Sequence, residues 1–314
     1  MILSFLTLFI AIALVIFLTS RLNWHPFLVL ILVSIGFGLA SGMSTNDILN
    51  TLQKGFGDTL GSIGIIIVVG LIIGTFFEKS GGAIVVANFF VTFFGKKRVH
   101  TAIAFMGYLI SIPVYADSGF VILTPINKAL TKRVGVSMAG TAVALGMGLT
   151  ASHTMVPPTP GPLAAAAIIG ADLGWVIVFG LVASSIGLLV FIQFSKKKEK
   201  KIWIESDSIS KTEEAVSPEE RPSLSRTIMP ILTPLLLIVI RAVVEYPGFP
   251  IEEGELKAII TFIGHPIVAL LIGMFLAFRI PKSKASNRLS QSGWLGDAIK
   301  GSATIILITA AGGA

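Results

Sequence analysis

An aspartate and a histidine each lie where an apolar stretch of the sequence is interrupted. Asp117 falls in "SIPVYADSGF", where Pro113 removes a backbone donor and Gly119 tolerates dihedral angles that other residues avoid. A carboxyl group is costly in hydrocarbon unless it has a partner, a proton or water. Asp117 is therefore predicted to carry a proton or to orient a ligand. The alternative is that it caps the helix that follows.

His153 falls in the second interruption, "SHTMVPPTPGP", whose prolines exclude a continuous helix. A new helix is predicted to begin at Gly161–Pro162, because proline suits the first positions of a helix, and its free amides would attract a carboxylate. The imidazole of His153 can shuttle a proton near neutral pH or donate to a substrate hydroxyl. The alternative is a structural hydrogen bond across the interruption.

The two interruptions together supply the predicted binding site. Non-helical backbone at membrane depth is tolerated only where it is buried in protein or lines a watery cavity. Amides at the start of a half-helix attract an anion there, and freed carbonyls attract a cation or a proton donor. Asp117 and His153 are predicted to couple protons. The predicted substrate contacts are Tyr115, Asp117, Ser118, Ser152, His153, Thr154, Thr159 and Gly161.

The sequence carries no signature of an enzyme. It contains no cysteine, which excludes thiolate metal sites and cysteine nucleophiles, and it lacks the HExxH and GxSxG patterns of zinc and serine hydrolases. An enzyme is therefore not predicted, and neither is a metal site or a cofactor.

Composition identifies the class of protein that must position these groups. Of the 314 residues, 54% are hydrophobic and 13% are charged, against about 25% charged in a typical soluble domain. Apolar runs long enough to cross a bilayer recur from end to end, so an all-α, polytopic helical membrane protein is predicted. The net charge of +7 comes from short basic clusters between apolar runs, as the positive-inside rule produces. The lipid bilayer is thus the expected partner, and nucleic acid is not.

Two segments depart from simple spans. Residues 99–131 form two apolar pieces too short to cross, with cations at both outer ends, and are predicted to be a re-entrant hairpin with its tip at Pro113–Ser118. Residues 136–171 are predicted to be one discontinuous span. The polar stretch before residue 58 and residues 79–100 are predicted to be interfacial. Residues 195–226 are predicted to be a flexible cytoplasmic linker. Continuous spans are predicted at 2–20, 26–42, 58–78, 173–194, 228–244 and 259–279, with another starting near 299.

An internal repeat is also predicted. "WHPFLVLILVSIGFGLA" resembles "GHPIVALLIGMFLAFRI", and "FGDTLGSIGIIIVVG" resembles "LGDAIKGSATIILIT", at offsets of 240 between the histidines and 239 between Asp58 and Asp297. These aspartates are expected to be N-caps. The charge pattern orients the copies oppositely, which is an inverted-topology repeat. Residues 1–194 would form the first repeat and 227–314 an incomplete second one, so the chain is expected to be truncated at its C-terminal end.

The chain resembles the gluconate permease (GntP-type) family of the ion transporter superfamily. The resemblance implies a bacterial inner-membrane, multi-pass symporter that imports gluconate or a related small hydroxy or amino carboxylate with protons. Family members commonly carry Phe-Phe-Asp-Val at the hairpin tip, where this chain has Tyr115 to Ser118, and many have a second histidine where it has Thr159. The segments that carry the resemblance are "GFGDTLGSIG", "KSGGA", "IPVYADSGFVIL", "HTMVPPTPGPLAAA", "GADLG" and "GWLGDAIKGSATIILITAAGGA".

Other interpretations stay open at this point. One is a sodium-coupled carboxylate carrier or an ion antiporter of the same superfamily, and another is a truncated membrane protein that does not transport. The sequence also leaves the oligomeric state open, including a homo-oligomer.

Overall fold

The fold is all-helical, as predicted, throughout the part of the chain that the structure describes. The computed structural model describes residues 2–199, 202–205, 220–247, 251, 253–282 and 287–314, and these ranges contain no strand. The helices are α1 (Ile2–Ser20), α2 (Pro26–Ala40), α3 (Thr45–Lys79), α4 (Gly82–Phe94), a short 3-10 helix (Lys96–Arg98), α5 (Val99–Ile110), α6 (Ala116–Val134), α7 (Met138–Met155), α8 (Pro160–Ile169), α9 (Leu173–Glu199), α10 (Leu224–Val244), α11 (Glu255–Ile263), α12 (Pro266–Ala277) and α13 (Trp294–Gly312).

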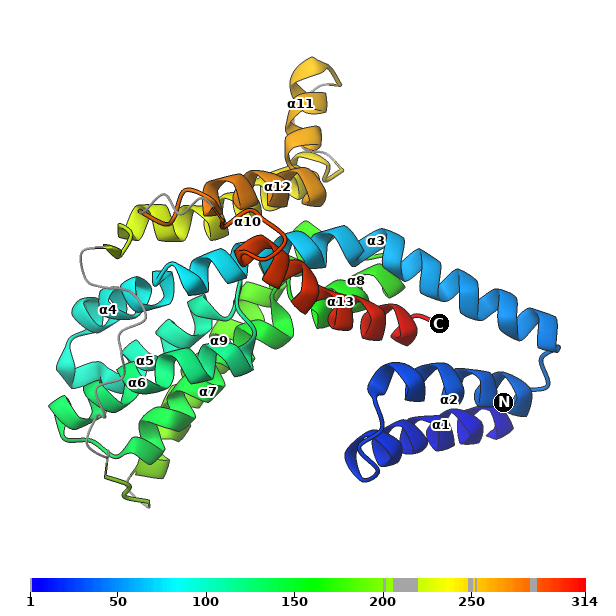
Figure 1. Cartoon of the computed structure of the whole chain (residues 1–314), viewed down its shortest axis with the longest axis horizontal. Coiled ribbons are helices and arrows are strands. Elements are labelled where there is room, and N and C mark those ends of the chain that lie inside the picture. Colours follow the sequence, from blue (N-terminus) through cyan, green and yellow to red (C-terminus); the bar gives the residue numbers. More distant parts are fainter. Residues whose placement is uncertain (1, 200–201, 206–219, 248–250, 252, 283–286) are drawn as a thin grey trace.

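Helix α3 runs through the middle of the molecule (Figure 1). Helices α4 to α7 and α9 form a bundle beside its C-terminal end, α10 and α12 lie along one side, and the α1–α2 pair lies near its N-terminal half. Among the described contacts, α3 packs against α13, α12, α8 and α2. The central helix is therefore the element that connects the rest of the fold.

Several helices have the length and apolarity to cross a membrane. Four described helices meet both conditions, namely α3, α9, α10 and α13, and the bent pair α11–α12 would make a fifth span. These helices confirm the prediction of a polytopic helical membrane protein. Four further apolar helices are shorter, and they include α2, α4 and α5.

The predicted start of the span at residue 58 is wrong, because α3 is one continuous helix of 35 residues. It begins at the N-cap Ser44, whose hydroxyl accepts a hydrogen bond from the backbone N–H of Asp47 at 3.2 Å. No proline interrupts the polar part of the helix, and isolated glycines are tolerated within helices. Asp58 lies inside α3 and is not an N-cap. The stretch predicted to be interfacial is thus the first part of the central helix.

The helix–break–helix predicted for the hairpin is confirmed. Helix α5 ends at Ile110 and α6 begins at Ala116, so the break spans residues 111–115. Helix α6 starts three residues earlier than position 119, where the sequence placed it, and runs on to Val134. Asp117 and Ser118 therefore lie in the first turn of α6 and not in the tip. The second predicted break is present as well, with α7 ending at Met155 and α8 beginning at Pro160. That residues 136–171 cross the membrane as one discontinuous span stays a prediction.

Two other segment predictions need correction. The span predicted at 259–279 is two helices, α11 and α12, which meet at a bend of 62° at Gly264 and His265. Part of the predicted flexible linker is ordered, since α9 continues to Glu199 and residues 202–205 bind the start of α7. There the Ser137 hydroxyl donates to the Ile202 carbonyl at 2.9 Å and accepts from the Ile204 N–H at 3.0 Å. Residues 206–219 of the linker lie outside the described residues.

An aromatic cluster joins the central helix to the C-terminal helices. Phe76 of α3 is 1% exposed, and its ring centroid lies 4.9 Å from that of Phe278 and 5.3 Å from that of Trp294. These contacts connect α3 to the end of α12 and to the start of α13.

Replacing Phe76 with Ala is expected to lower the free energy of unfolding in detergent by about 3 kcal/mol, because it leaves a cavity between three helices. Thermal unfolding of the purified protein measures the change. Phe93→Ala is the matched control, since Phe93 is 70% exposed on α4 and should cost under about 1 kcal/mol. Equal losses in the two variants would contradict the role given to the cluster.

Candidate functional site

The structure brings the two interruptions together. The rings of Tyr115, which precedes α6, and His153, in the last turn of α7, meet edge to face with centroids 5.5 Å apart. Both side chains line one small cavity with Pro113 and Thr159. Its volume is about 20 Å³, which is room for about one water molecule. The predicted meeting of the two breaks is therefore present, in a closed form.

A larger cavity lies on the other side of the hairpin tip. It has a volume of about 240 Å³ and is enclosed by the tip, the end of α3 and the start of α13. Tyr115 and Ser118 line it from the hairpin, and Thr75 and Glu78 line it from α3. Tyr115 lines both cavities, so the hairpin tip separates a water-sized space from one large enough for a small organic acid.

The histidine at the break has an unsatisfied nitrogen. His153 Nδ1 is buried and has no hydrogen-bond partner in the described part of the chain. A buried polar atom without a partner costs free energy, so such atoms mark places where water, a proton or a ligand is bound. The structural hydrogen bond considered as an alternative for His153 is not formed at this nitrogen.

Asp117 lies in the first turn of α6 and is exposed. The N-cap of α6 is Tyr115, and no side chain caps the helix, so Asp117 does not serve as its cap. The carboxylate makes no hydrogen bond or ion pair with any described residue, although its charge acts on His153. Helix α8 likewise has no side-chain cap at its N-cap Thr159. The first turn of α6 therefore offers backbone N–H groups without a side-chain partner, as an anion site requires. At the start of α8, Pro160 and Pro162 carry no N–H, so only Gly161 offers one.

The hydroxyl groups of the second break already have partners. Ser152 Oγ donates to the Tyr108 carbonyl of α5 at 2.6 Å, and Thr159 Oγ1 donates to the Val156 carbonyl at 2.8 Å. Thr154 is exposed and its hydroxyl donates to the Thr150 carbonyl at 2.8 Å. Gly161 is exposed, and neither cavity at the hairpin tip is lined by Ser152, Thr154 or Gly161. The substrate contacts assigned to these residues stay predictions.

Helix α3 supports both breaks through one face. A side-chain carbon at Gly74 would lie 1.9 Å from the Pro113 carbonyl oxygen, and one at Gly70 would lie 3.3 Å from Pro158 Cγ. Residues four apart share a helix face, so Glu78 follows on the same stripe and reaches the larger cavity. The sequence favours an interfacial role for Glu78, because it ends its span before Lys79 and Ser80. The regular spacing of Gly70, Gly74 and Glu78 in an apolar helix could have indicated its place beside the hairpin tip.

Asp297 also lines the larger cavity, where it forms an ion pair with Lys79 at the end of α3. It does not cap α13, whose N-cap is Gly293, because it lies one turn into the helix. The expectation that Asp297 is an N-cap is therefore wrong. Within the described residues, no group of three or more histidine, aspartate or glutamate side chains could hold a metal ion.

Residues 3–314 match the family described as "GntP family permease". The chain belongs to the GntP permease family. It is 35% identical to a protein named an uncharacterized permease in Haemophilus influenzae, over 98% of this chain and 65% of that protein. It is 32% identical to a gluconate permease of Pseudomonas aeruginosa, over 94% of this chain and 66% of that protein. It is also 32% identical to the D-serine transporter DsdX of Escherichia coli, over 87% of this chain and 61% of that protein.

The GntP permease chain spans about two thirds of the length of these curated relatives. No solved structure matches it. Family membership together with the apolar helices makes it a multi-pass membrane protein of a family of permeases, not of enzymes. The two breaks, with their exposed helix starts, are the part of this permease that its own geometry singles out.

The contact between Gly74 and the hairpin tip can be tested directly. Gly74→Ala places a methyl group on the Pro113 carbonyl, so the tip must shift, and we expect about 2 kcal/mol lower stability and at least a tenfold weaker binding of a ligand at the tip. Thermal unfolding and equilibrium binding measure the two effects. Gly61→Ala is the control on the same helix, because a side-chain carbon there meets nothing within 4 Å. A Gly74→Ala protein that behaves like the control would contradict the contact.

Proposed function

We propose that this protein is a secondary active transporter of the bacterial inner membrane that takes up gluconate or a related small hydroxy or amino carboxylate together with protons. The observation that carries the proposal is the meeting of two helix breaks at Tyr115 and His153, with a buried nitrogen left unsatisfied. The names of two relatives, a gluconate permease and a D-serine transporter, support this class of substrate.

The roles of the groups follow from their chemistry. The substrate carboxylate would bind the free amides in the first turn of α6 and the Gly161 N–H at the start of α8, where the helix dipoles favour negative charge. Substrate hydroxyl or amino groups would bind Tyr115 and Ser118, which line the larger cavity. Ser152, Thr154, Thr159 and Gly161 complete the proposed substrate site from the second break.

Proton coupling has an electrostatic reason in this site. A carboxylate substrate bound at the start of α6 brings a negative charge close to Asp117, and like charges repel each other. A proton on Asp117 or His153 relieves that repulsion, so proton and substrate each favour the binding of the other. Glu78 lines the larger cavity at the hairpin tip and is a third ionisable group that extends the proton-coupling set proposed from the sequence.

The inverted repeat stays a proposal, and matched local geometry supports it. The N-cap His25 of α2 has φ −63° and ψ 127°, the N-cap His265 of α12 has φ −60° and ψ 131°, and a proline follows each at the first helical position. The next helices of the two copies, α3 and α13, pack against each other. A re-entrant position for the α5–α6 hairpin belongs to the same proposal.

Uptake by the full-length protein in proteoliposomes tests the function. With an inward proton gradient we expect accumulation of labelled D-gluconate or D-serine above the equilibrium level, and collapse of the gradient should abolish it. Accumulation that follows a sodium gradient at constant pH would assign coupling to sodium instead. A protein that accumulates neither acid under either gradient would overturn the proposal.

Variants of the ionisable groups test the coupling. Asp117→Asn and His153→Gln are each expected to lower proton-driven accumulation at least tenfold while exchange of labelled for unlabelled substrate continues, because exchange needs no net proton movement. Glu253→Gln is the control, since that carboxylate is 85% exposed and pairs with Lys257. Loss of exchange and accumulation to the same extent would point to substrate binding alone.

A further inference from the structure

A further cavity lies apart from the two cavities at the hairpin tip. It has a volume of about 270 Å³ and lies between α3, α8, α10 and the start of α12. Its polar lining residues are Ser62, Asp172, Arg241 and His265, and none of them lines the cavities at the hairpin tip. The remaining walls are apolar and include Ile63 and Leu163.

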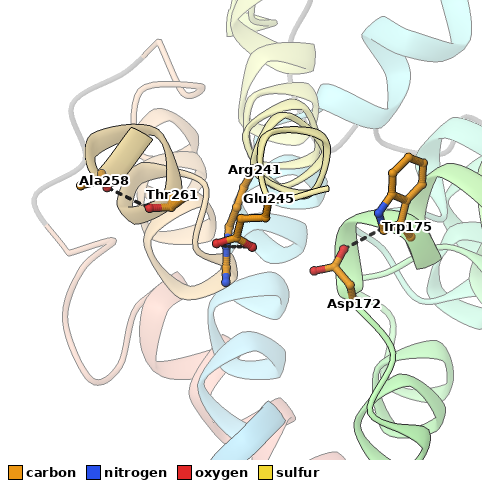
Figure 2. Close-up of polar contacts among 6 residues, drawn as sticks. All are labelled: Asp172, Trp175, Arg241, Glu245, Ala258 and Thr261. Carbon is orange, nitrogen blue, oxygen red and sulfur yellow. Dashed lines mark hydrogen bonds and ion pairs between the residues drawn. The ribbon is translucent and has the colours of Figure 1, made fainter. Parts of the chain in front are cut away.

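Arg241 brings unused hydrogen-bond donors to this cavity. Its Nε donates to both carboxylate oxygens of Glu245, at 3.0 Å each. A guanidinium has five N–H donors, and the four on its two Nη atoms have no hydrogen-bond partner among the described residues. Figure 2 shows the guanidinium extending past the Glu245 carboxylate. The Arg241 side chain as a whole is 25% exposed.

Close helix packing fixes the surroundings of Arg241. A side-chain carbon at Gly264 would lie 2.5 Å from Arg241 Cβ and 2.6 Å from the Leu237 carbonyl oxygen, so only glycine allows this approach. The start of α12 therefore rests on the last turn of α10 and brings His265 to the cavity. The charges of Arg241 and Glu245 both act on His265.

A hydrogen-bond acceptor lies on another wall of the same cavity. Asp172 Oδ1 accepts from the backbone N–H of Trp175 at 3.1 Å, which fixes the carboxylate at the start of α9 (Figure 2). Its Oδ2 makes no hydrogen bond with any described residue. The Trp175 ring packs edge to face on Tyr246, with centroids 5.6 Å apart, next to Glu245. The cavity thus holds a cationic donor fork and a fixed acceptor.

We propose that this cavity is a second binding site, for a small carboxylate that also carries a hydroxyl or ammonium group. The two Nη atoms of Arg241 hold the carboxylate in a bidentate pair, which is the geometry that a guanidinium fits best. Asp172 Oδ2 accepts from the hydroxyl or ammonium group, and the ligand's carbon chain lies on the apolar walls. The identification of the ligand with the transported acid rests on the proposed function. The prediction that the cavity binds a carboxylate rests on Arg241.

The position of the cavity suits a loading site for the transport pathway. Ile66 of α3 lines it, whereas the next residue, Ile67, lines the cavity at the two breaks. Helix α8 is shared in the same way, with Leu163 at this cavity and Thr159 at the breaks. A substrate held by Arg241 is therefore a few side chains away from Tyr115 and His153. Basic clusters at residues 196–201 and 279–288 are predicted to lie inside, which predicts the outer side of the membrane for this end of α10.

Fluorine NMR of the full-length protein labelled with 5-fluorotryptophan tests the site without a transport assay. Trp175→Phe assigns the Trp175 resonance among the four tryptophans of this chain. Titration with D-gluconate or D-serine is expected to shift this resonance saturably. Arg241→Gln should weaken the apparent affinity at least tenfold, and Arg241→Lys should also weaken it, because an ammonium cannot form the bidentate pair. Glu245→Gln should strengthen it severalfold, because a competing carboxylate is removed.

Asp117→Asn is the matched control, because it alters the site at the breaks and should leave the Trp175 titration unchanged. No saturable shift with either acid, or equal affinities in the wild type and Arg241→Gln, would overturn the inference. If Arg241→Gln does not fold, Arg241→Lys decides by the same criterion. Uptake by the same proteins keeps the two proposals apart. If the protein takes up the acid but the titration does not depend on Arg241, the second site is wrong and the transport function stands. If the titration depends on Arg241 but there is no uptake, the transport function is wrong and the second site stands.

Discussion

The contact of α3 with the hairpin tip at Gly74 is the constraint on which the arrangement of the site depends. A broken helix in a bilayer leaves backbone groups that hydrocarbon cannot satisfy, so the break must rest on protein or water. Here the Pro113 carbonyl occupies the place where a side chain on Gly74 would be, and Pro158 of the other break packs at Gly70. Both breaks thus lie on one face of a single continuous helix. That common support is what brings Tyr115 to His153.

Tyr115 lines two cavities of unequal size. The space between the breaks holds about 20 Å³, and the space beyond the hairpin tip holds about 240 Å³. Pro113, Val114 and Tyr115 line both, so the tip itself is the partition.

Much of this arrangement could be predicted from the sequence, because proline and glycine act locally. The break before Asp117 and the one after His153 follow from residues whose backbone preferences exclude a helix. The predictions that a span begins at residue 58 and that residues 259–279 form one span were wrong. Hydropathy gives the length of an apolar run, but it does not show whether a polar stretch continues the helix or whether the helix bends. Neither the partners of the Ser152 and Thr159 hydroxyls nor the ion pair of Asp297 could be predicted. These partners depend on the packing of the helices, which decides which backbone carbonyls and which lysine come within hydrogen-bonding distance.

The two proposed binding sites differ in the charged groups that line them. The residues that line the cavities at the breaks include no arginine or lysine, and the nearby Lys79 is paired with Asp297. A carboxylate arriving there meets helix-start amides and the charge of Asp117, so a mobile positive charge must accompany it. The cavity at Arg241 has a permanent positive charge whose Nη donors are unused by any described residue. A fixed cation can attract an anion but cannot travel with it, whereas a proton can do both. The two proposed sites therefore differ in chemistry, with a fixed cation at the Arg241 cavity and a proposed transferable one at the breaks.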